Sequence, residues 1–184
     1  PNEAMLAEAS AHEEQKNITY VKGTSENTTL ESGRFDAVVS AQAFHWFNPE
    51  LALQEFKRIL KPDGWIALMW NERDESDPFT KEYGDLLRTL PDTSLLEVSR
   101  GAAGQALFDC DYLKEQHKDD FSNLQVLDLD LFLGRAFSAS YSPDPDSREA
   151  LVFEEKLRAV FDRYAVDDGQ VVMKYVCSVY SARV

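Results

Sequence analysis

Two apolar runs stand on either side of a helical pattern in the first half of the chain. Residues 35–40 read FDAVVS and residues 65–70 read WIALMW, and both are nearly continuous in hydrophobicity. Such runs predict strands of a parallel sheet with helices covering both faces. Asn48 can cap a helix whose first residue is Pro49. That helix has apolar residues at helical spacing at Ala52, Leu53, Phe56, Ile59 and Leu60. With a turn at residues 61–64, the segment predicts a right-handed strand–helix–strand crossover.

The patterns in the rest of the chain predict further elements of an α/β fold. Helices are expected over residues 3–16, about 80–90, about 105–117, and after a loop at 141–147. Strands are expected over residues 18–21, 124–133 and 171–180. The helix after the loop has apolar side chains at helical spacing at Phe153, Leu157, Val160, Phe161 and Tyr164. We expect one domain, residues 1–184, in which the less regular residues 73–123 form a cover or insertion.

Composition excludes several functional classes. The chain has 184 residues and a formal net charge of −14, which repels nucleic acid. No apolar run approaches the length of a membrane span, so no membrane partner is expected. Two cysteines are too few for a thiolate zinc site, and they fit a reducing compartment such as the cytoplasm. The three histidines show no metal-ligand spacing, and we expect no metal site.

Six short sequence words occur in an order and spacing typical of a known family. They are PNEAM at residues 1–5, GTSE at 23–26, FDAV at 35–38, AQAFHW at 41–46, LKPDG at 60–64 and WN at 70–71. On these words the chain resembles the class I S-adenosylmethionine-dependent methyltransferases, in particular the group of ubiquinone, menaquinone and trans-aconitate methyltransferase-like proteins. The resemblance implies a Rossmann-like, doubly wound sheet that is mostly parallel, with an antiparallel C-terminal edge.

The resemblance also implies what precedes these words in the family. Family members begin with a strand, a Gly-rich turn, a helix and a strand that ends in an acid, and these parts hold the cofactor. That first strand–helix–strand unit is not found in these residues, so the chain is expected to be N-terminally incomplete. The strands at 18–21 and 35–40 would then each lack a neighbour, and we expect the chain either to self-associate through these sheet edges or to rearrange locally.

By resemblance, two groups of residues would bind S-adenosylmethionine. The first comprises Asn2, Thr24, Ser25 and Glu26, of which the GTSE residues would meet the adenine. The alternative for these is a polar turn with local hydrogen bonds. The second group is Gln42, Ala43 and Phe44, which follow the 35–40 strand, at the end where open α/β sheets bind ligands. For Phe44 and the neighbouring aromatic residues the alternative is packing against the following helix.

The acceptor pocket is expected to include His45, Trp46, Asn71 and Arg73. Aromatic faces attract a sulfonium cation and wall an apolar pocket. His45 is a weak candidate for a general base, although a structural histidine is the alternative. Arg73 could pair with a substrate carboxylate, or form an ordinary surface ion pair.

Two functions are therefore predicted by the sequence. The first is transfer of a methyl group from S-adenosylmethionine to a small-molecule acceptor by a cytoplasmic transferase, of which this chain is an incomplete part. The second is a non-catalytic, methyltransferase-like binding or assembly module, which the missing Gly-rich turn would favour.

Overall fold

The computed structural model describes residues 3–11, 17–91, 103–166 and 168–184. They form two compact units. Unit 1 combines Pro1–Leu68, Ala103–His117 and Tyr180–Val184, and unit 2 combines Met69–Ala102 and Lys118–Val179. The elements follow in the order α1 (Glu3–Ala11), β1 (Phe35–Ala41), η1 (Phe44–Trp46), α2 (Pro49–Ile59), β2 (Leu60–Arg73), α3 (Pro78–Leu87), β3 (Lys114–Leu127), α5 (Leu129–Phe137), α6 (Arg148–Tyr164) and β4 (Val171–Arg183).

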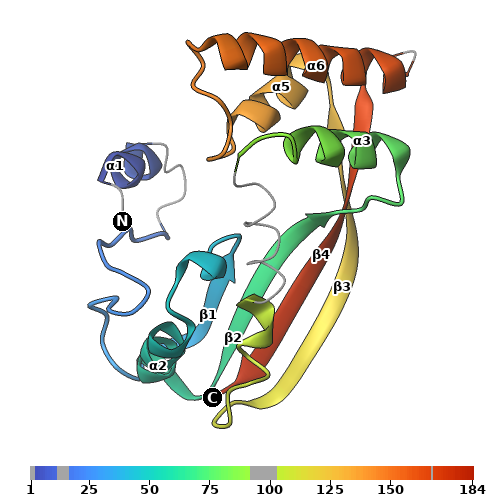
Figure 1. Ribbon diagram of the computed structural model, residues 1–184. Coiled ribbons are helices and arrows are strands. Elements are labelled where there is room, and N and C mark those ends of the chain that lie inside the picture. Colours follow the sequence, from blue (N-terminus) through green and yellow to red (C-terminus); the bar gives the residue numbers. More distant parts are fainter. Residues whose placement is uncertain (1–2, 12–16, 92–102, 167) are drawn as a thin grey trace. The chain divides into compact units, whose positions relative to one another are not determined.

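Four strands form one sheet in the order β1-β2-β4-β3, and the last three contribute residues to both units. The expected α/β class is confirmed. β4 runs opposite to its neighbours β2 and β3, whereas β1 and β2 run the same way (Figure 1). The expectation of a mostly parallel sheet is therefore wrong for the described strands. The antiparallel end takes up a larger share of the sheet because β4, the last strand in the chain, inserts between β2 and β3.

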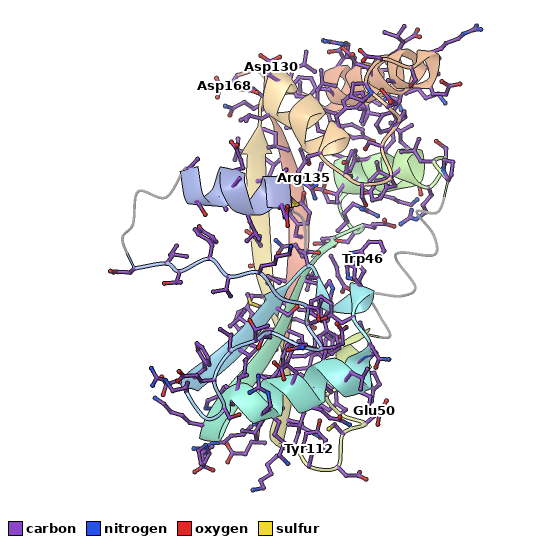
Figure 2. The ribbon with its side chains drawn as sticks, turned by 90° about the vertical axis from the view of Figure 1, so that its left-hand side faces the viewer. Trp46, Glu50, Tyr112, Asp130, Arg135 and Asp168 are labelled. Atoms are coloured by element: carbon purple, nitrogen blue, oxygen red, sulfur yellow. The ribbon has the colours of Figure 1, made fainter. Side chains whose placement is uncertain are left out.

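The predicted crossover is present in unit 1. The side chain of Asn48 accepts a hydrogen bond from the backbone N–H of Leu51 at 3.2 Å, and Pro49 opens α2. The apolar side of α2 is buried at Ala52, Leu53, Phe56 and Ile59. Glu50, in the first turn, extends into solvent, where a negative charge favours the positive end of the helix dipole (Figure 2). The capping signals thus fixed the start of this helix correctly.

Burial of the two apolar strands is one-sided rather than two-sided. Along β2 the side chains of Ile66, Leu68 and Trp70 are buried, while Trp65 is 38% exposed. Along β1 only Ser40 is buried, and Val39 is 61% exposed. Helix α1 buries no residue, so it covers no sheet face. The continuous apolar pattern therefore identified the strands correctly but overstated how much of each is covered.

Three local predictions are corrected in the first 117 residues. Residues 18–21 are not a strand: Ile18 and Val21 are each 48% exposed, and no described strand pairs with them. Strand propensity without a ladder partner does not make a strand. Residues 61–64 belong to β2, because the end of the chain pairs there through the Val184 N–H and the Gly64 carbonyl at 3.0 Å. Within residues 105–117, Gln105 ends a short helical turn, further turns follow, and β3 begins at Lys114.

The predicted strand at 124–133 is also misplaced. β3 ends at Leu127, and Asp128 caps α5 by accepting a hydrogen bond from the N–H of Leu131 at 2.8 Å. The alternation of leucines and aspartates in this stretch conceals a helix cap, because Asp128 fits an outward strand position as well as an N-cap. α3, α6 and β4 match the predicted helix near 80–90, the helix after 141–147 and the final strand, apart from their ends.

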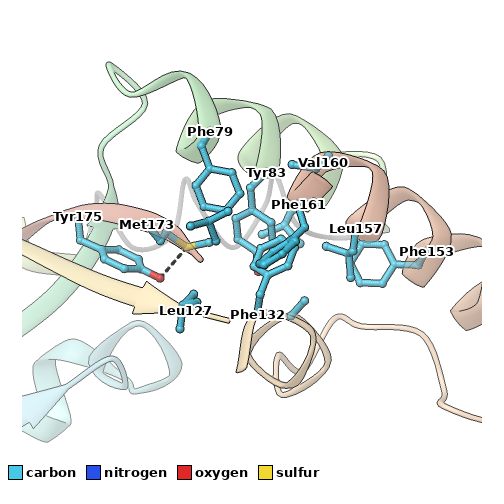
Figure 3. Close-up of a cluster of buried hydrophobic side chains, with 13 residues drawn as sticks. Phe79, Tyr83, Leu127, Phe132, Phe153, Leu157, Val160, Phe161, Met173 and Tyr175 are labelled. Atoms are coloured by element: carbon cyan, nitrogen blue, oxygen red, sulfur yellow. Dashed lines mark hydrogen bonds between the residues drawn. The ribbon is translucent and has the colours of Figure 1, made fainter. Parts of the chain in front are cut away.

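Unit 2 has its own hydrophobic core, shown in Figure 3. α3, α5 and α6 contribute aromatic side chains around Phe132, whose ring centroid lies 5.6 Å from Phe79, 5.4 Å from Tyr83 and 5.8 Å from Phe161. β4 adds Val171, Met173 and Tyr175. Since each fully buried aromatic contributes roughly 1.5–3 kcal/mol, this cluster is a principal source of stability for the unit.

Candidate functional site at the end of strand β1

The polypeptide at the carboxyl end of β1 adopts a costly conformation. Gln42 has a φ of +54°, in the left-handed region that residues other than glycine rarely adopt. Such a residue costs about 1–3 kcal/mol unless its surroundings require it. Two residues earlier, the hydroxyl of Ser40 is buried without a hydrogen-bond partner among the described residues. A strained residue and an unsatisfied hydroxyl at one strand end suit a binding site better than simple packing.

Phe44 and Phe47 hold the next turn, η1, against α2. Phe44 is fully buried, and its ring centroid lies 5.5 Å from Phe47 and 6.2 Å from Phe56. The packing that the sequence allowed as an alternative is therefore the observed environment of the Phe44 side chain. Its part in cofactor binding stays a prediction that concerns its backbone, together with that of Ala43.

His45 and Trp46 form the outer face of the same turn. Their ring centroids are 4.9 Å apart, and Trp46 is 63% exposed (Figure 2). His45 is half-buried. A large exposed indole beside an imidazole gives unit 1 an aromatic surface directly after Gln42. Such a surface attracts cations and apolar groups.

The GTSE residues fold into a tight turn that is tied to α2. The backbones of Thr24 and Asn27 exchange two hydrogen bonds, of 3.0 and 3.2 Å. Glu26 accepts one hydrogen bond from the Ser25 hydroxyl at 2.7 Å and another from the backbone N–H of Asn48 at 3.1 Å. These donors, Ser25 first, hold the pKa of Glu26 below its ordinary value.

The bond between Glu26 and Asn48 brings two predicted groups of site residues together. It joins the GTSE turn to the start of α2, two residues after Trp46. No local sequence pattern predicts this bond, because its two partners are 22 residues apart in the chain. The local hydrogen bonds are those expected of a polar turn, and adenine recognition by Thr24, Ser25 and Glu26 stays a prediction.

The remaining predicted site residues lie elsewhere. Asn2 is outside the described residues. Asn71 and Arg73 belong to unit 2, where Asn71 accepts a hydrogen bond from the side chain of Asn123 at 3.2 Å. Arg73 is 3.9 Å from Glu75, and its side chain is only 12% exposed, so this is not a surface ion pair. A role for either residue in acceptor binding stays a prediction.

We also searched the described residues for metal-binding groups and for helices that could span a membrane. In the described ranges, no group of three or more His, Cys, Asp and Glu side chains could hold a metal ion. Within the same ranges, no helix is long and apolar enough to cross a membrane.

Comparison with known proteins shows similarity to methyltransferases in sequence and in fold. Residues 1–68 match a family model described as a methyltransferase domain. A structure from Anaeromyxobacter dehalogenans, provisionally described as a type II methyltransferase, superposes with a TM-score of 0.66 at 18% identity. The superposition covers 96% of this chain and 76% of that one. By sequence and by fold, the chain is similar to methyltransferases.

Curated relatives give the same result over a short stretch. An uncharacterised methyltransferase of Mycobacterium bovis is 42% identical over 65 residues, which is 35% of this chain and 27% of that protein. An uncharacterised methyltransferase of Schizosaccharomyces pombe is 42% identical over 71 residues, covering 39% of this chain and 28% of the relative. The chain thus spans little more than a quarter of the length of these methyltransferase relatives. The family match ends at Leu68, where the first segment of unit 1 also ends.

Proposed function

We propose that the protein transfers a methyl group from S-adenosylmethionine to a small-molecule acceptor. The observation that carries this proposal is the end of β1, where a strained Gln42 and an exposed Trp46 follow a strand within the methyltransferase-matching residues 1–68. Ligands of open α/β sheets bind outside the carboxyl ends of strands, and this position fits that rule. The cytoplasm is the proposed location, in keeping with a chain that has only two cysteines.

The residues at this strand end suit the cofactor's chemistry. S-adenosylmethionine supplies an activated methyl group on a sulfonium centre. The cation is attracted to an aromatic face such as that of Trp46. Gln42 presents amide donors and an acceptor from an exposed position, and the Glu26 turn is linked to the same region through Asn48. Backbone groups of Ala43 and Phe44 complete the proposed cofactor wall.

Holding the acceptor in line with the methyl group can provide much of the rate enhancement, because the carbon is already activated. His45 is half-buried beside Trp46 and can accept a proton from an acceptor that must lose one. Asn71 and Arg73 of unit 2 are proposed to contact the acceptor.

Calorimetric titration with S-adenosylhomocysteine tests this function. The 184-residue chain and, in parallel, the complete product of its gene are titrated. We expect Gln42→Ala and His45→Ala to weaken binding of the cofactor product or of an acceptor about tenfold, with little change in melting temperature. Gln54→Ala, at an exposed position of α2, is the matched control and should bind normally. Absence of binding by both proteins would contradict an enzymatic role and favour a non-catalytic module.

A further inference from the structure

Unit 2 contains a cavity of about 370 Å³ where the end of α3 meets the first half of α6. These two helices pack against each other (Figure 1). The cavity is lined by residues 89–90, which follow α3, by Pro143 of the loop before α6, and by α6 itself. Every lining residue belongs to unit 2, so the cavity shares no residue with the strand end of β1. Its volume lies in the range of pockets that hold small molecules.

Part of the lining is apolar and fixed by the core. Phe153 is 3% exposed, belongs to the core of unit 2 (Figure 3), and has its ring centroid 5.5 Å from that of Phe137. Leu90 packs against the same core, while Pro143 and Val152 add apolar surface nearer to solvent. Val152 is 45% exposed. A hydrocarbon or aromatic group that covered this surface would remove it from water.

Two cations line the same cavity. Arg148 and Lys156 lie eight residues apart on α6, about two helical turns. Both are exposed, and neither forms an ion pair with a carboxylate among the described residues. The other two arginines of α6, Arg158 and Arg163, are each paired with a carboxylate. The cations that line the cavity are thus available to a ligand.

The remaining polar residues limit the charge of that ligand. Glu149 also lines the cavity, in the first turn of α6, where the helix dipole favours a carboxylate. Two cations and one carboxylate leave the lining with one net positive charge. The hydroxyl of Thr89 donates to the carbonyl of Leu86 at 2.7 Å, so its oxygen can only accept from a ligand. The charged donors to an anion are therefore Arg148 and Lys156.

We propose that this cavity binds a small monocarboxylate with an apolar or aromatic body. The carboxylate pairs with Arg148 and Lys156, and the body lies against Leu90 and Phe153. A guanidinium can hold a carboxylate through two parallel hydrogen bonds. One net positive charge matches a monoanion, whereas a dianion would place a further negative charge near Glu149. The site requires no S-adenosylmethionine and does not rest on the function proposed above.

Hydrocinnamate is the probe, with hydrocinnamyl alcohol and phenylpropylamine as matched comparisons, because the three share one body and differ in their end group. NMR titration of the isotope-labelled 184-residue chain without cofactor should show millimolar binding of hydrocinnamate, as expected for so small a ligand. The shifted amide signals should include those of residues 148–156. The alcohol should bind at least about threefold more weakly, and the amine more weakly still. Acetate, which lacks the body, should also bind more weakly than hydrocinnamate.

Charge variants should change the affinity in opposite directions. Arg148→Gln and Lys156→Gln should each weaken hydrocinnamate binding about three- to tenfold, whereas Glu149→Gln should strengthen it about twofold. Arg158→Gln, on the same helix but outside the lining of the cavity, should leave binding unchanged. All four positions are exposed, so the variants should fold, which thermal denaturation checks.

Three results would overturn the proposal. They are no binding of hydrocinnamate to the native chain, equal affinity for the amine, and unchanged affinity in both Arg148→Gln and Lys156→Gln. Amide shifts confined to residues outside the cavity would place the ligand elsewhere and count equally against it. Because no cofactor is present and the changed residues lie away from the end of β1 in the chain, these outcomes are separate from those of the S-adenosylhomocysteine titration.

Discussion

Two residues of unit 1, Glu55 and Gln42, have opposite effects on the stability of the fold. Glu55 is buried in α2, where it accepts hydrogen bonds from Arg58 at 2.7 Å and from the backbone N–H of Thr28 at 2.8 Å. Gln42 has a left-handed backbone that its side chain disfavours. The first arrangement stabilises the fold, because it satisfies a buried charge and anchors the loop before β1. The second costs stability and is consistent with a binding role.

Glu55→Gln should destabilise the protein by about 1–3 kcal/mol at neutral pH. The hydrogen bonds from Arg58, and those from Thr28, lower the pKa of Glu55 from 4.5 to about 2 in the folded protein, against the opposing effect of burial. The stabilisation is therefore complete above pH 4.5 and is lost as pH falls toward about 2. Urea unfolding across this range should show the native and variant curves converging at low pH.

Glu50→Gln is the control for that experiment. Glu50 lies in the first turn of the same helix but is exposed, and its replacement should change stability by less than about 0.5 kcal/mol. Parallel curves for native protein and Glu55→Gln would show that the carboxylate is not held by Arg58 and Thr28.

Gln42→Gly should raise stability while lowering ligand affinity. Glycine adopts a φ of +54° without strain, so we expect a gain of about 0.5–1 kcal/mol in the free energy of unfolding. Removal of the amide should weaken S-adenosylhomocysteine binding. Gln54→Gly, inside α2, should instead cost about 1 kcal/mol. A loss of stability in Gln42→Gly would mean that its side chain packs rather than binds.

At the level of elements, the sequence predicts those parts whose signals are local. α2 was predicted from Asn48, Pro49 and the apolar spacing, and β1 and β2 from their apolar runs. The prediction of a strand at residues 18–21 was wrong because a strand depends on a partner elsewhere in the chain. The prediction of a strand over residues 124–133 was wrong beyond Leu127 because aspartate, here Asp128, suits a helix cap as well as an outward strand position. The left-handed backbone of Gln42 depends on the surroundings of this residue in the folded chain, and no local sequence pattern specifies it.

Asn48→Ala should destabilise the protein by about 1 kcal/mol through loss of the α2 cap. The Asn48 side chain accepts from the N–H of Leu51, while its backbone N–H binds Glu26. Fraying of this end should also loosen the GTSE turn. Hydrogen exchange should therefore be faster at Leu51 and at residues 24–27. Asn48→Ser, which keeps a cap, should restore most of the protection; equal exchange in both variants would mean that the cap does not order the turn.

At the scale of the whole molecule, the chain consists of two compact units. Unit 1 holds the methyltransferase-matching residues and the strand end proposed to meet the cofactor. Unit 2 has a separate aromatic core. Residues 73–123, expected to be a cover, contribute α3 and most of β3, so this stretch supplies part of the sheet as well.

The exposed edge of the sheet leads to the last prediction, which concerns association of the chain. β1 is a terminal strand in the order of described strands, and Val39 on it is 61% exposed. Unpaired backbone groups beside an exposed β-branched side chain promote pairing with another copy. Light scattering should therefore show concentration-dependent self-association. Val39→Lys should weaken it about tenfold, on the order of 1 kcal/mol. Val172→Lys, on the interior strand β4, should not. A monodisperse monomer with protected amides throughout residues 35–41 would exclude edge pairing, because protection would then come from within the chain.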